Sequence, residues 1–101
     1  MKNIDRIKLN EERLDNILKS IKELEKSLEI FKSNMKDINK LNKYYGSKNW
    51  FKDFDDYNSG KINNIKAGVL SEDSVWNMNE DIKEIALEMK NISDKILKTD
   101  I

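Results

Sequence analysis

Neither cysteine nor histidine occurs among the 101 residues of this chain, and proline is missing as well. Without cysteine the chain can form no disulfide, thiolate nucleophile or thiolate metal site. Without histidine it lacks the usual general base near neutral pH and the commonest metal ligand. The commonest routes to side-chain catalysis are therefore closed, and we expect no catalytic residues, no enzyme activity, no metal and no cofactor.

An excess of charge of one sign is also missing, because 19 basic and 19 acidic side chains give a formal net charge of zero. A neutral chain has no excess positive field to drive counterion release, so we expect neither nucleic acid nor a membrane surface as partner. No window approaches the roughly 20 apolar residues that span a bilayer. The charged start, MKNIDRIKLNEERL, lacks the apolar core of a signal peptide. These absences predict a cytoplasmic protein.

The residues that are present suit long helices. Apolar and charged residues each make up 38% of the chain, which allows only a thin core. Such a balance is typical of amphipathic helices, in which a narrow apolar stripe faces a large solvated surface. The length fits a single domain covering residues 1–101. We predict an all-α protein, a long antiparallel helical hairpin that is coiled-coil-like and carries a short aromatic helical cap.

A heptad pattern of apolar residues runs through the first part of the chain. It predicts a helix over about residues 3–45, on the order of 60 Å long. Because so narrow a stripe does not stabilise a helix alone, this helix needs a partner. The a and d positions, interrupted by Asn10 and Asn42, hold Ile7, Leu14, Ile17, Ile21, Leu24, Leu28, Phe31, Met35, Ile38 and Tyr45.

The stretch YYGSKNWFKDFDDY, residues 44–57, contains most of the aromatic residues and follows this helix. Gly46 stands where a helix C-terminus favours positive φ, and Ser47 is placed to cap a new short helix.

Trp50, Phe54 and Tyr57 recur at helical spacing, on one face of that short helix. The favoured interpretation is that Trp50 and Phe54 close the end of the hairpin by packing against Tyr45. The alternative is an exposed aromatic patch that binds a partner, to which Asp53 would also contribute.

The acidic run in this stretch invites comparison with a calcium loop. It contains Asp53, Asp55 and Asp56 and is followed by Gly60. A calcium loop with Gly60 at its sixth position would place Lys66 where the bidentate glutamate belongs. That register fails, so we interpret these carboxylates as solvating the outer face of a short helix.

A third segment with helical spacing closes the chain and predicts a last helix over residues 71–98, after a cap and linker over residues 46–70. Ser71 is the expected N-cap, and Leu70 with Val75 forms a hydrophobic staple. Its stripe holds Val75, Met78, Ile82, Ile85, Met89, Ile92 and Ile96.

The two long helices have matching periods and unequal lengths. If they pair antiparallel from a compact cap, about four turns of the first helix lack a partner. Ile4, Ile7 and Leu14 would then be exposed and available for binding. Because exposed heptad positions usually mark association, we expect a protein partner or a homo-oligomer, in the simplest case a homodimer.

Two motifs, YYGSKNWFKDFDDYNSGKI and KAGVLSEDSVWNMNEDI, resemble a family of small bacterial proteins catalogued as domain-of-unknown-function family 4298. The resemblance implies an all-helical fold and no established activity, and it supplies no catalytic residues. This chain departs from the pattern at Asn63, where proline often stands in the family. The matching residues are Tyr44, Tyr45, Gly46, Ser47, Trp50, Asp53, Gly60, Gly68, Val69, Leu70, Ser71, Glu72 and Asp73.

Three hypotheses about function follow. The first is a non-enzymatic protein–protein interaction module that uses the heptad faces or the cap. The second is a small inhibitor from a mobile element that acts on a host defence complex, a hypothesis that rests on size and class only. The third is a carboxylate metal-binding protein, for which bound Ca²⁺ or Mn²⁺ should raise the melting temperature.

Overall fold

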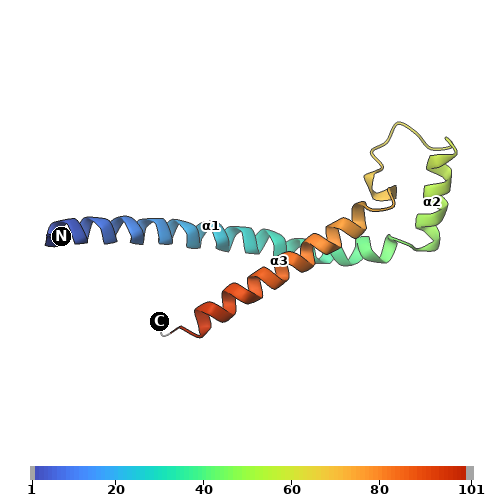
Figure 1. Cartoon of the computed structure of the whole chain (residues 1–101). Coiled ribbons are helices and arrows are strands. Elements are labelled where there is room, and N and C mark those ends of the chain that lie inside the picture. The colour runs from blue at the N-terminus through green and yellow to red at the C-terminus, as the bar shows by residue number, and fades with distance from the viewer. Residues whose placement is uncertain (1, 100–101) are drawn as a thin grey trace. The chain divides into compact units, whose positions relative to one another are not determined.

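The computed structural model describes residues 2–99, which form helices without any strand (Figure 1). Helix α1 spans Asn3–Tyr44, α2 spans Lys48–Asn58, the 3-10 helix η1 spans Gly68–Leu70, and α3 spans Ser74–Leu97. The predicted all-α class is confirmed. The element order, a long helix, a short helix and a second long helix, is that of a helical hairpin with a short helical cap. The chain divides into two compact units, one ending at Lys40 and the other beginning at Leu41.

Helix α1 has 42 residues and no buried side chain. Asp5 in its first turn and Lys43 in its last turn both complement the helix dipole. No proline interrupts it, and charged residues separate the apolar positions of the heptad pattern. Its charged faces keep it solvated, while its apolar stripe lacks a covering element within the first unit.

The break between α1 and α2 occurs where the sequence predicts it. Gly46 has φ of +78°, and the amide of Ser47 donates to the carbonyl of Tyr44 at 2.9 Å. This left-handed residue ends α1 without a Cβ penalty. The hydroxyl of Ser47 accepts from the amide of Trp50 at 3.2 Å, so the expected N-cap of α2 is confirmed.

Helix α2 ends in a turn through Gly60, whose φ is +84°. The amide of Ile62 donates back to the carbonyl of Asp56 at 3.2 Å. No helical turn forms around Ile62 and Ile65, where Asn64 adopts a left-handed φ of +61°. Asparagine tolerates that conformation better than most residues, and it interrupts any helix at this point. Between α2 and α3 only η1 is helical among the described residues.

The expected start of the last helix is wrong by three residues. Ser71 ends η1, donating from its amide and its hydroxyl to the carbonyl of Gly68 at 3.1 and 2.9 Å. Its hydroxyl also accepts from the amide of Ser74 at 3.2 Å, but the N-cap position of α3 is Asp73, without a side-chain cap. The staple residues Leu70 and Val75 are nevertheless both buried.

The packed core of the described residues lies entirely in the second unit. Its buried hydrophobic side chains are Trp50, Leu70 and Val75, one from each of α2, η1 and α3. Helix η1 contacts both α2 and α3 and joins them. Along α3 the stripe is buried or half-buried only near its start, and from Ile85 onward it is exposed.

Candidate functional site

Four aromatic rings, one from the turn after α1 and three from α2, form the aromatic cluster, which consists of Tyr45, Trp50, Phe51 and Phe54. The indole of Trp50 is at its centre and is only 6% exposed. The rings of Tyr45 and Phe51 meet it edge-on at centroid distances of 5.3 and 5.1 Å, and Phe54 stacks on it at 5.2 Å. These are the favourable geometries for ring pairs. The predicted packing of Trp50 against Tyr45 is confirmed, while the ring that Phe54 contacts is that of Trp50.

Polar atoms of the aromatic cluster hold the segment that leads into α3. The indole N–H of Trp50 donates to the carbonyl of Val69 at 2.9 Å, and the hydroxyl of Tyr45 donates to the carbonyl of Glu72 at 2.7 Å. Both carbonyls belong to a stretch outside regular α-helix, where backbone acceptors need other partners. The aromatic cluster therefore supplies hydrogen bonds as well as packing to the entry of α3.

A second polar contact ties the end of α1 to α2. The hydroxyl of Tyr44 donates to Oδ2 of Asp53 at 2.6 Å. The hydrogen bond to Asp53, with smaller contributions from desolvation and from the carboxylate charge, raises the pKa of Tyr44 to about 12. Asp53, expected as part of an acidic surface, is half-buried and accepts this hydrogen bond.

The last turn of α1 also contacts the start of α3 within the second unit. The amides of Asn42 and Asn79 exchange two hydrogen bonds, at 3.1 and 2.8 Å. Asn42 is the residue that interrupts the heptad pattern, and this pairing gives its amide a partner. Asn79 was not singled out from the sequence. The available signal was Asn42 itself, because a polar residue at a heptad position indicates that its side chain has a hydrogen-bond partner.

The predicted partner-binding residues are thus placed in two separate regions. In the second unit Trp50 is buried, Tyr45, Asp53 and Phe54 are half-buried, and Tyr57 is 37% exposed. Phe51, which was not among them, exposes more than half of its surface although its ring touches Trp50. The remaining predicted residues belong to α1.

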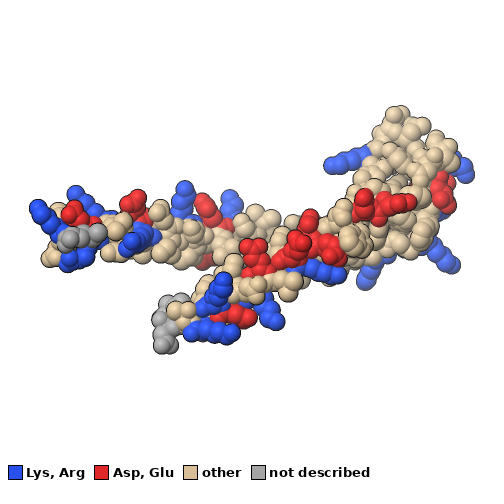
Figure 2. All heavy atoms as spheres, viewed as in Figure 1, with Lys and Arg blue, Asp and Glu red and all other residues tan. Residues whose placement is uncertain are grey.

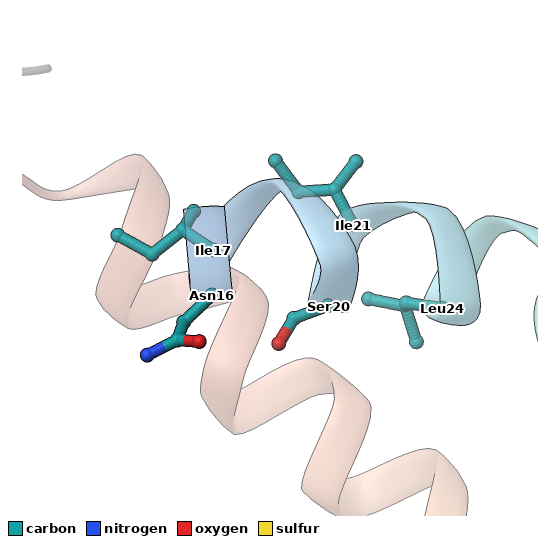
Figure 3. A pocket seen from close by; sticks show the side chains of 5 residues that line it. All are labelled: Asn16, Ile17, Ser20, Ile21 and Leu24. Atoms are coloured by element: carbon teal, nitrogen blue, oxygen red, sulfur yellow. The ribbon is translucent and has the colours of Figure 1, made fainter. Parts of the chain in front are cut away.

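Six large aliphatic side chains in the first half of α1 form what we call the N-terminal stripe. Each exposes between 46% and 62% of its surface. Figure 3 shows two of them, Ile17 and Ile21, which line a shallow depression on α1 together with Asn16, Ser20 and Leu24. The N-terminal stripe consists of Ile4, Ile7, Leu14, Ile17, Leu18 and Ile21.

The family described as Domain of unknown function (DUF4298) matches residues 7–92 of this chain. The chain belongs to this family. No curated protein and no solved structure matches it.

The two motifs that carry the resemblance to DUF4298 meet in the second unit. Tyr45 and Trp50, from the first motif, donate to the carbonyls of Glu72 and Val69, from the second. Within the first motif, Tyr44 binds Asp53. Motif residues of this DUF4298 chain therefore hold its small packed unit together.

Charges on the DUF4298 chain are mixed in sign along α1, whereas acidic side chains gather over the first half of α3 (Figure 2). Among residues 2–99 no three carboxylates are placed to hold a metal ion. Over the same residues, no helix combines the length and the apolar character required to cross a bilayer.

Proposed function

We propose that the chain is a non-enzymatic protein–protein interaction module that binds through the N-terminal stripe of α1. The observation that supports this is the exposure of six aliphatic side chains along one face of one helix. Scattered exposed aliphatics are ordinary, but several of them on one face of a helix usually mark an interaction site. Helices that lay such a face into a groove or against another helix form a common mode of recognition.

The aromatic cluster is a weaker candidate for the binding surface. Its central indole is buried, and its polar atoms already donate to Val69 and Glu72 within the chain. A side chain that has internal partners loses them when it turns toward another protein. The N-terminal stripe has no such competing role, since α1 has no buried residue.

The experiment is affinity capture with matched variants. Ile7→Glu combined with Leu14→Glu places two carboxylates on the N-terminal stripe and lowers the net charge by about two. Lys19→Glu makes the same change in net charge on the opposite, solvated face of the same segment. Glutamate suits a helix interior, so neither change should unwind α1.

We expect the wild-type chain and the Lys19→Glu variant to retain the same protein, whether another protein or an untagged copy of this chain, and the stripe variant to lose it. The circular dichroism of the chain and its tryptophan fluorescence, which reports on the second unit, should be the same for the wild type and both variants. Equal capture by the stripe variant and the control, or capture of nothing by any of them, would contradict the proposal.

A further inference from the structure

The N-terminal stripe lies beyond the reach of the other long helix in the chain. The Asn42–Asn79 pair fixes where α3 starts beside α1, and α3 ends at Leu97. From Asn79 the rest of α3 extends about 18 residues, on the order of 27 Å. Even fully aligned along α1, it would stop near Leu24. The aliphatic side chains before that residue therefore need a partner from outside the chain.

We propose that this partner is a second copy of the chain, bound parallel and in register along residues 3–23 of α1. This inference rests on the proposed function and names its partner. In such a pair each a or d residue faces the same residue of the second copy. The layers formed by Ile7, Leu14, Ile17 and Ile21 would then be apolar. The layer formed by Asn10, between those of Ile7 and Leu14, would be polar.

Charges beside the N-terminal stripe favour this parallel pairing. Arg6 occupies a g position and Glu11 the following e position. In a parallel pair a g residue meets the next e residue of the other helix, so Arg6 faces Glu11 of the second copy, twice by symmetry. Arg13 meets Leu18 of the second copy, where its methylene stem can cover the leucine. No pair of like charges arises in this register.

Asn10 provides the register. Its Nδ2 donates to the carbonyl of Arg6 at 2.9 Å, and its Oδ1 accepts from Arg13 at 3.2 Å. An asparagine amide has two N–H donors and two oxygen lone pairs, so one of each is left for Asn10 of the second copy. A shift by one heptad would place this amide against the aliphatic Ile17. A polar heptad residue selects register in this way in coiled coils.

Antiparallel pairing of the same segment is less favourable. Centred on this segment, it sets Arg13 against Arg13 and Glu11 against Glu11 of the second copy, and it places Asn10 opposite Leu14. Displaced by one heptad, it forms no pair of opposite charges and places Asn10 opposite Ile21. Pairing Asn10 with Asn42 of the second copy would break the bonds of Asn42 to Asn79.

The surface available is sufficient for a modest dimer. Six aliphatic side chains, each about half exposed, would from two copies remove on the order of 1,000 Å² from water. That is the lower end of specific interfaces, so association at tens of micromolar is the expected range. The next d and a positions, Leu24 and Leu28, are also exposed.

The absence of cysteine allows a direct test in the full chain. Ile7→Cys and Leu14→Cys each place a thiol at an a position, where a parallel dimer brings the two copies within disulfide distance. Glu12→Cys places it on the opposite face. On mild oxidation we expect disulfide dimers from Ile7→Cys and Leu14→Cys at about tenfold the yield from Glu12→Cys. Sedimentation equilibrium of the wild type should show dimer at tens of micromolar.

Three results would overturn the proposal: a wild-type monomer at that concentration, equal yields from Glu12→Cys and Leu14→Cys, or a mixture of Ile7→Cys with Ile17→Cys that forms mainly the mixed disulfide. The last result is the signature of antiparallel pairing. If the chain is monomeric while stripe-dependent capture of another protein persists, the second copy is ruled out and the proposed function stands. If capture also fails, both fall.

Discussion

The indole N–H of Trp50 donates to the carbonyl of Val69 across 19 residues of sequence, at 2.9 Å. This bond joins α2 to η1, which precedes α3, and the ring of Phe54 stacks on the same indole. Since the side chain is buried, the bond is shielded from water, and the carbonyl would have to find another donor if the indole were removed.

Trp50→Phe should therefore destabilise the second unit by about 2 to 4 kcal/mol, because it removes a buried donor and leaves space beside the ring. Urea denaturation followed by circular dichroism measures the change. The matched control is Trp76→Phe, since Trp76 is 58% exposed in α3 and its replacement should alter stability by no more than about 0.5 kcal/mol. Equal effects of the two substitutions would contradict the central role of Trp50.

The hydrogen bond from Tyr44 to Asp53 predicts a loss of stability at alkaline pH. The pKa of Tyr44 rises from 10.0 to about 12, so the folded state keeps its proton at pH values where the unfolded chain releases it. The stability that the folded chain gains from the protonated Tyr44 is fully present below pH 10.0 and is lost as the pH rises through about 12. Ultraviolet titration of tyrosinate should show one late-titrating tyrosine.

Tyr44→Phe should remove that late tyrosine from the titration and flatten the dependence of the melting temperature on pH over the same range. Tyr57→Phe is the control, because the structure shows no hydrogen bond from the hydroxyl of Tyr57 within the described residues. If Tyr57→Phe removes the late titration instead, the Tyr44–Asp53 bond is not its source.

Sequence signals that act over a few residues predicted their structures well. Gly46 and Ser47 end one helix and start the next through contacts within four residues, and both roles are confirmed. The heptad pattern predicted α1 almost to its last residue, since the spacing of apolar residues and the absence of proline are properties of the segment itself. The packing of Trp50 followed from its place among other rings.

Long-range hydrogen bonds account for what the sequence did not reveal. Ser71 resembles an N-cap locally, but its amide and hydroxyl close η1, and Tyr45 holds the next carbonyl, that of Glu72. A residue 27 positions away thus helps to decide where α3 begins. The acceptor role of Asp53 was likewise invisible, because its donor, Tyr44, lies on another helix.

The reciprocal amide pair of Asn42 and Asn79 should appear as a coupling energy. Replacing either residue with alanine should cost about 0.5 to 1.5 kcal/mol, since each loses two hydrogen bonds that are partly exposed to water. The double variant should cost less than the two single variants added together, by about 1 kcal/mol. Urea denaturation of the four proteins measures this cycle. Strict additivity would show that the pair contributes nothing to the second unit.

Two glycines offer a matched test of backbone conformation. Gly46 has φ of +78° and Gly68 does not have positive φ, while a Cβ built on either would meet nothing within 4 Å. Gly46→Ala should therefore destabilise the α1–α2 junction by about 1 to 2 kcal/mol, through left-handed strain alone. Gly68→Ala should be neutral or stabilise by up to about 1 kcal/mol, because it restricts the unfolded chain. Thermal unfolding compares the two. A larger loss at Gly68 than at Gly46 would contradict the conformations described for both residues.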